Sequence, residues 1–287
     1  MSRTPDPSHQ PTSSTSTTAR RPVRIAFSVQ PQHAEYADIR RAVVAAEEAG
    51  ADVVTNWDHF FPLFGDPDGK HFECWTMLAA WAEATSRVQL APLVTPVSYR
   101  NPDLLADMAR TLDQISGGRL ILGLGAGWAE RDYAEYGYEF GSAGQRLDAL
   151  EQAIGRITTR WGRLNPPPTR PIPLLIGGSG EKRTLRYAAR HADIWHAIGE
   201  PDFLRRKSAI LDDWCAREGR DPAAIERSTV AGAPTSGGTP SVAVGPDTVG
   251  PELLAAGFTL LNVRSGGPNY DLGPLRDWLA WRDAVNR

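Results

Sequence analysis

Short apolar runs alternate with longer amphipathic segments along most of the chain. Residues 23–29 and 51–56 have the length and composition of buried strands. Between them, residues 35–49 place alanine, valine and isoleucine at helical spacing, and Gly50 follows as a residue that ends a helix. A strand, a helix and a second strand in this order predict parallel pairing of the two strands.

The same alternation continues to the end of the chain. Six further strands are predicted at residues 87–94, 119–125, 174–177, 193–198, 226–231 and 258–264. Seven further helices are predicted at residues 74–85, 102–115, 144–161, 181–191, 201–218, 248–256 and 272–285. Eight strand–helix units in 287 residues favour a closed (β/α)8 TIM barrel over an open sheet.

The first residues do not share this pattern. Residues 1–22 are rich in serine, threonine and proline and lack the apolar core of a secretion signal, so we expect a disordered tail. No motif divides the rest, and residues 23–287 are therefore predicted to form a single barrel domain.

Charge and cysteine content exclude several classes of partner. The net charge of −3 gives no reason to expect binding to nucleic acid or to an anionic membrane, and no apolar run approaches the ~20 residues of a membrane span. Cys74 and Cys215 lie in no metal-binding motif, which is typical of reduced thiols in a cytoplasmic protein. A small-molecule substrate is the expected partner.

In a parallel barrel the chemistry is carried by the loops that follow the strands. The second predicted strand leads into Trp57, Asp58 and His59. His59 could exchange a proton with a ligand or donate a hydrogen bond to a bound ring, with Asp58 orienting it or contacting the ligand directly. Alternatively, His59 only caps its own loop.

The third and fourth predicted strands end in backbone-rich loops. Prolines at 92 and 96 disrupt regular pairing, so the backbone there could face a flat ligand, or simply enter a helix that begins with proline. Residues 123–128 break the dinucleotide-binding glycine pattern at Trp128, and they favour close approach to a flat ligand. Trp128 and residues 130–132 would line the substrate side. The candidate ligand-binding residues are Pro92, Leu93, Thr95, Gly125, Ala126 and Gly127.

The loop after the fifth predicted strand carries the strongest physical signal. Small residues run from the strand into a helix, where free N–H groups and the helix dipole attract an anion, and Lys182 and Arg183 add positive charge. The alternative is a tight turn that uses glycine for its geometry alone. The candidate phosphate-binding residues are Gly177, Gly178, Ser179, Gly180 and Lys182. The six histidines show no metal-binding spacing, so no metal is predicted.

Five segments together resemble the luciferase-like monooxygenase superfamily, and specifically its coenzyme F420-dependent oxidoreductases. They are residues 56–60, 90–102, 116–120, 123–133 and 175–184, in the order in which the family has them. The resemblance implies a barrel with the ring of the cofactor in its mouth and the phosphate near the fifth strand. It also implies a non-prolyl cis peptide near Pro92–Leu93.

The implied chemistry is hydride transfer between a deazaflavin and a small organic substrate, with His59, Asp58 and Trp128 as candidate catalytic residues. Two alternatives remain: a monooxygenase that uses FMN and molecular oxygen, and a barrel that binds such a cofactor without catalysis. Residues 162–173 form a shorter excursion before the fifth strand than the family usually has, and residues 233–246 match no pattern of the family. A homodimer is possible, since dimers are common in the family.

Overall fold

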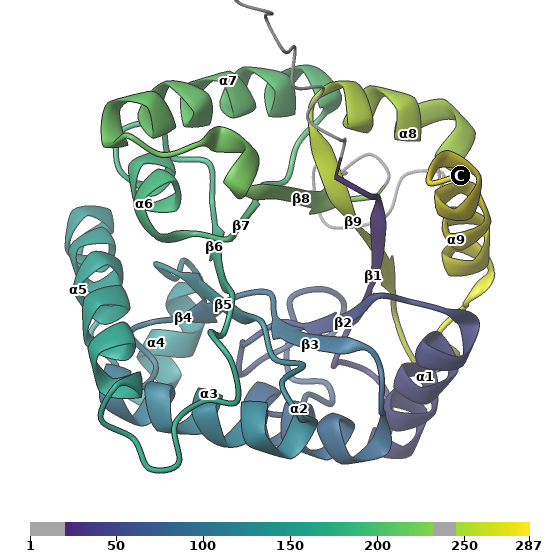
Figure 1. Cartoon of the computed structure of the whole chain (residues 1–287). Helices are drawn as coiled ribbons and strands as arrows, with labels where there is room; N and C mark the ends of the chain where they lie inside the picture. Colours follow the sequence, from purple (N-terminus) through teal and green to yellow (C-terminus); the bar gives the residue numbers. More distant parts are fainter. Residues whose placement is uncertain (1–20, 232–244) are drawn as a thin grey trace, which may run out of the picture.

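The computed structural model describes residues 21–231 and 245–287. Almost all of the expected tail at residues 1–22, and most of the segment 233–246, lie outside the described residues. The described chain forms a ring of parallel strands surrounded by helices, which confirms the predicted (β/α)8 barrel (Figure 1).

Nine strands build the sheet because the third predicted strand is interrupted. They are β1 (Arg24–Val29), β2 (Val53–Asn56), β3 (Gln89–Pro92), β4 (Thr95–Pro96), β5 (Leu122–Gly125), β6 (Leu174–Gly177), β7 (Ile194–His196), β8 (Glu226–Val230) and β9 (Phe258–Ser265). The prediction of one continuous strand at residues 87–94 was wrong at this point. Leu93 and Val94 leave the sheet, and pairing resumes at Thr95.

The helices follow the strands with one addition. They are α1 (Tyr36–Ala49), α2 (Cys74–Ala84), α3 (Pro102–Ser116), α4 (Glu130–Tyr136), α5 (Ala143–Trp161), α6 (Thr184–His191), α7 (Pro201–Glu218), α8 (Pro246–Ala255) and α9 (Gly273–Val285). Along the described chain, no helix combines the length and the hydropathy needed to cross a membrane.

Helix α4 lies where the sequence predicted only a long loop. Its acidic first turn and the left-handed Gly137 at its C-terminus are ordinary helix signals, which the strong glycine pattern before it obscured. Helix α6 begins at Thr184, three residues later than predicted, so residues 181–183 belong to the loop.

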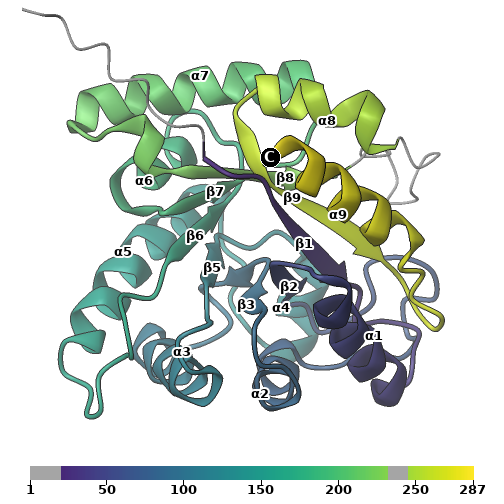
Figure 2. The ribbon, with the colours of Figure 1, turned by 45° about the vertical axis from the view of Figure 1, so that its right-hand side comes forward.

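The barrel closes at two places. The strand order is β3-β2-β1-β9-β8-β7-β6-β5-β4, and β3 also meets the start of β5 through hydrogen bonds between Leu90 and the backbone of Arg119 and Ile121. At the other closure the first strand, β1, runs beside the last, β9 (Figure 2). The Asn286 side chain bonds both backbone groups of Val23, at 2.9 Å each, and so fixes the end of α9 to the start of β1.

Side chains inside the barrel form layers. At the N-terminal end of the strands, Arg24 pairs with Glu226 and donates a 2.5 Å hydrogen bond to Gln89. The next layer is apolar, and its members come from seven strand positions: Ala26, Val53, Ala91, Ile121, Leu175, Ile194 and Leu260. Because strand side chains alternate, the third layer contains the residues two positions further on. It is polar on β1, β2, β7 and β9, which contribute Ser28, Thr55, His196 and Asn262.

Val94 fills the upper part of the interior next to this polar layer. A Cβ atom added to Gly125 or Gly177 would lie 2.6 Å or 3.0 Å from its methyl groups, so the two glycines make room for this one side chain. A Cβ on Gly123 would lie 2.0 Å from the Pro92 carbonyl oxygen. The cis peptide was expected near Pro92–Leu93; it is found one bond later, between Leu93 and Val94.

This packing predicts that Gly123→Ala destabilises the barrel. The added methyl group meets backbone rather than a movable side chain, so we expect a loss of about 1–3 kcal/mol in the free energy of unfolding. Gly155→Ala is the matched control, because Gly155 lies within α5 with open space around it and should gain up to about 1 kcal/mol. Urea denaturation measures both; equal midpoints for the two variants would contradict the packing described here.

Candidate active site

The C-terminal ends of the strands form a mouth with an apolar floor. Leu93 and Val94 are half-buried there and pack on the apolar layer of the barrel interior. The loops that follow β2, β5 and β6 all open onto this end because the strands are parallel. A flat ring placed in the mouth would therefore rest on aliphatic side chains.

His59 and Asp132 form a hydrogen-bonded pair beside this floor. The distance from His59 Nδ1 to Asp132 Oδ2 is 2.6 Å, and both side chains are buried. The Tyr99 hydroxyl donates to the same carboxylate oxygen at 2.7 Å, and the Phe60 amide donates to the other at 3.2 Å. Burial would raise the pKa of Asp132, but the hydrogen bonds from His59 and Tyr99 outweigh it and hold the pKa below its usual range.

Asp132 therefore orients His59. From the sequence, Asp132 had been expected only to line the substrate side. Asp132 is in the first turn of α4, the helix that the sequence did not predict. Arg131 does not line the substrate side either: it stacks 4.0 Å from the Phe61 ring centroid and bonds the Pro67 carbonyl at 2.7 Å. It thereby fastens α4 to the loop after β2.

Asp58 belongs to a different network from its neighbour His59. It is fully buried, and both of its carboxylate oxygens meet Arg100, at 2.5 Å and 3.1 Å. Burial raises the pKa of Asp58 while Arg100 opposes the shift. Trp75 Nε1 donates to Asp58 and also to Thr95, at 3.2 Å and 3.0 Å, so Thr95 faces α2 rather than the mouth. These contacts give Asp58 and Thr95 a structural role in positioning the β4–α3 connection.

Trp128 stands at the rim of the mouth. Its side chain is 66% exposed, and its ring lies 5.4 Å from the ring of His59 in an edge-to-face arrangement. Every other tryptophan of the chain is buried or half-buried. An exposed indole beside a buried histidine is a suitable wall for a planar ligand.

The loop after β6 offers unused backbone donors. Gly178 N–H bonds the His196 carbonyl, but within the described chain the amides of Ser179, Gly180 and Lys182 bond no protein group. Arg183 turns away to Asp148 and to the Gly144 carbonyl on α5. The positive charge left at the loop is therefore that of Lys182, which is exposed.

Glu181 does not cancel that charge, because its carboxylate pairs with Lys207 on α7 at 2.7 Å.

The glycines after β5 have packing roles that require no ligand. Gly125 accommodates Val94, as Gly177 does, and Gly127 has a left-handed backbone and lies against Tyr133, whose hydroxyl a Cβ would approach to 2.0 Å. Ala126 packs against the outer core.

The opposite half of the mouth contains residues that the sequence did not identify. His196 Nδ1 lies 3.0 Å from Ser228 Oγ, which also accepts a 2.9 Å hydrogen bond from Asn262. Ser28 and Thr55 bond each other at 2.7 Å. All are in the polar interior layer, and Arg264 follows Asn262 on the same face of β9. The alternation of each strand, extended one pleat beyond its apolar residues, could have identified this set.

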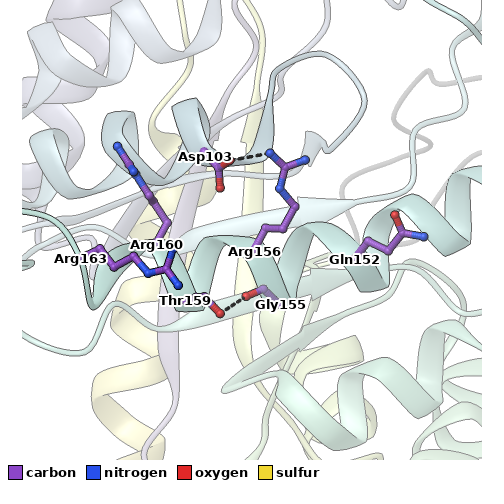
Figure 3. Close-up of a pocket in the computed structure, with 7 residues that line it drawn as sticks. All are labelled: Asp103, Gln152, Gly155, Arg156, Thr159, Arg160 and Arg163. Carbon is purple, nitrogen blue, oxygen red and sulfur yellow. Dashed lines mark hydrogen bonds and ion pairs between the residues drawn. The ribbon is translucent and has the colours of Figure 1, made fainter.

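A surface groove outside the barrel also has several charged lining residues (Figure 3). It runs along α5 and is lined by Arg156, Arg160 and Arg163 with Asp103 from α3. Arg156 pairs with Asp103 at 2.5 Å, and Arg160 contacts Asp107 at 3.3 Å. Because these charges are largely paired and the groove lies between helices α3 and α5 on the outside of the barrel, we place the active site at the mouth.

The Asp58–Arg100 pair predicts a large and pH-dependent effect of Arg100→Met. The variant leaves a buried carboxylate without its counter-charge, which should cost about 3–5 kcal/mol at pH 8. In the folded variant, burial without Arg100 raises the pKa of Asp58 above its unfolded value of about 3.9, so the carboxyl takes up a proton on folding. The loss of stability should therefore be smaller at pH 5 than at pH 8. Stability from denaturant titration at both pH values is the measurement.

The double variant Asp58→Asn/Arg100→Met is the control, because it removes both charges and should recover most of the loss. If Arg100→Met alone were as stable as the wild type, or if the loss were the same at both pH values, the pair would not hold this part of the mouth together.

Known proteins resemble the chain over most of its length. A family model described as luciferase-like monooxygenase matches residues 13–244. An F420-dependent glucose-6-phosphate dehydrogenase of Amycolatopsis mediterranei is 31% identical over 175 residues, which are 54% of this chain and 51% of that protein. The chain spans about half the length of such curated relatives.

Two solved structures share the fold. An F420-dependent secondary alcohol dehydrogenase in complex with an F420–acetone adduct has a TM-score of 0.77 at 20% identity, covering 93% of this chain and 100% of that one. The oxygenating constituent of 3,6-diketocamphane monooxygenase of Pseudomonas putida, solved with FMN, has a TM-score of 0.68 at 16% identity, covering 93% and 98%. With the family match, these likenesses lead to one conclusion: the chain belongs to the luciferase-like monooxygenase family.

Proposed function

We propose that the protein is an F420-dependent oxidoreductase that transfers a hydride between the deazaflavin and a small organic substrate. The observation that carries the proposal is the His59–Asp132 pair at 2.6 Å, which lies beside an apolar floor at the mouth of the barrel. The F420-dependent relative and the F420-dependent structural neighbour support the choice of cofactor.

The described residues fit such a cofactor at both of its ends. Leu93 and Val94 would support the ring from below, and Trp128 would border it. The unused amides of Ser179 and Gly180, with Lys182, would hold the phosphate. A Cβ at Gly180 would lie 2.8 Å from Thr184 Oγ1, so a larger residue would narrow this cradle.

The cofactor, when bound, supplies the hydride chemistry, and the protein supplies position and proton handling. His59 Nδ1 faces Asp132, so its N–H is directed to the carboxylate and Nε2 is left for the ligand. A substrate alcohol that loses a hydride from carbon must also lose its hydroxyl proton, which Nε2 accepts; in the reverse direction Nε2–H returns it to the carbonyl oxygen. Asp132 stabilises the imidazolium formed in the first case.

A second candidate is a monooxygenase that uses FMN and oxygen. The same floor and phosphate loop suit FMN, and the FMN-containing neighbour supports it. The carbon that replaces N5 in a deazaflavin makes the reduced form react poorly with oxygen, so the two functions differ in an observable way.

The deciding experiment is a parallel titration of the protein with F420 and FMN, followed by fluorescence. We expect the tighter binding for F420, and no oxygen consumption with the reduced cofactor. Tighter binding of FMN with oxygen consumption would favour the second candidate, and binding of either without turnover would favour a non-catalytic barrel. Riboflavin, which lacks the phosphate, is the control: Lys182→Met should weaken FMN binding about 10-fold and leave riboflavin binding unchanged.

The proton-handling role predicts a division between binding and turnover. His59→Ala should reduce turnover by about 10²–10⁴-fold on a substrate found by screening small alcohols and ketones, with cofactor affinity changed far less. Asp132→Asn should cost about 10²-fold in turnover, because the His59 ring loses the carboxylate that orients it. Unchanged turnover in His59→Ala would refute the role.

A further inference from the structure

We infer that the half of the mouth formed by β7, β8 and β9 binds an anionic group of the substrate, a carboxylate or a phosphate, through Arg264. The assignment of this anion to the substrate rests on the proposed function, but the anion site itself depends only on the geometry of these strands. Four observations carry it: where Arg264 points, what charge surrounds it, what lies beneath it, and how it relates to the phosphate loop.

Arg264 points into the barrel. Side chains alternate along a strand, and Leu260 on β9 is a member of the apolar interior layer, so Asn262 and Arg264 face the same way. Asn262 confirms this alternation, because it bonds Ser228 inside the barrel. Arg264 is paired in register with Ser28 of β1, which also faces inward to Thr55. The guanidinium therefore lies one layer above the polar interior layer, toward the mouth.

The surroundings of Arg264 leave its positive charge uncompensated. Its side chain is accessible to solvent, yet the protein packed around it desolvates the guanidinium and lowers its pKa. A side chain at the open end of a barrel can show both properties. In residues 21–231 and 245–287, no carboxylate pairs with Arg264. Three arginines at other strand ends or in the barrel wall are paired instead: Arg24 with Glu226, Arg100 with Asp58 and Arg282 with Asp52. A partly desolvated cation without a protein partner favours an anionic ligand.

The polar interior layer beneath Arg264 supplies uncharged hydrogen-bonding groups. His196 is 6% exposed, and burial, with Arg264 nearby, lowers its pKa to about 3, so it is uncharged at neutral pH. Its Nδ1 is used by Ser228, and its Nε2 bonds no side chain of the described residues. A carboxylate or phosphate oxygen would thus meet one positive charge and one neutral imidazole, which suits a single anionic group.

The site is separate from the phosphate loop. Arg264 lies near the end of β9, whereas the loop with Ser179 and Lys182 follows β6, and β7 and β8 lie between them in the sheet. The phosphate of the proposed cofactor would already have donors there. We therefore assign the anion at Arg264 to the substrate, while the alternative source, the polar edge of the cofactor ring, is an outcome of the test.

The test measures binding of paired probes that differ only in charge: benzoate against benzyl alcohol, and glucose 6-phosphate against glucose. Calorimetry with the wild type, Arg264→Gln and Arg264→Lys is done with and without bound cofactor. We expect the wild type to prefer the anionic member of at least one pair, and Arg264→Gln to lose 10-fold or more of that affinity. Arg264→Lys keeps the charge and should retain part of it, which shows that the pocket is still folded.

Arg163→Gln is the matched control, because Arg163 is an exposed arginine in the groove of Figure 3 and its removal should change nothing. Equal affinity for the charged and uncharged probes in the wild type would overturn the inference. So would a loss of F420 or FMN affinity in Arg264→Gln with anion binding intact, since Arg264 would then contact the cofactor. Failure of the cofactor titration with anion binding preserved would instead count against the proposed function alone.

Discussion

The architecture of the mouth depends on the side chain of Val94 inside the barrel. It contacts both β5 and β6, and glycine at positions 125 and 177 leaves room for it because a larger residue at either position would crowd its methyl groups. The third strand must leave the sheet to deliver it, which separates β3 from β4. The same departure sets Leu93 and Val94 across the top of the apolar layer, where they form the floor. One packing requirement thus explains the interrupted strand, the glycines and the apolar surface on which a ring would rest.

Local sequence signals predicted the eight strand–helix units because each depends on periodicity within a few residues. The alternation, the proline that opens α3 and the left-handed Gly50 all correspond to the structure. The site was less predictable, since its contacts join residues distant in sequence. His59 was identified, but its partner is 73 residues away on an unexpected helix, and the neighbour Asp58 seemed the simpler choice. His196 and Arg264 were missed because their strands were taken only as core.

Adjacent residues serve separate networks at the end of β2. Asp58 turns toward Arg100 and fixes the connection to α3, whereas His59 turns toward Asp132 and the mouth. In the first network Asp58 is fully buried and paired within the protein, whereas the second network leaves one imidazole nitrogen for a ligand. The division keeps a fixed negative charge near the floor without letting it repel an anionic ligand, because Arg100 neutralises it.

The pairing of β1 with β9 has a consequence for the order of folding. The first strand cannot find its second neighbour until nearly the whole described chain has left the ribosome. Until then β1 has an open edge, and the floor and both halves of the mouth have no closed wall to hold them. Such long-range closure makes folding slow and leaves the N-terminal units exposed to mispairing, so nascent chains of this protein should depend on chaperones more than its compact units suggest.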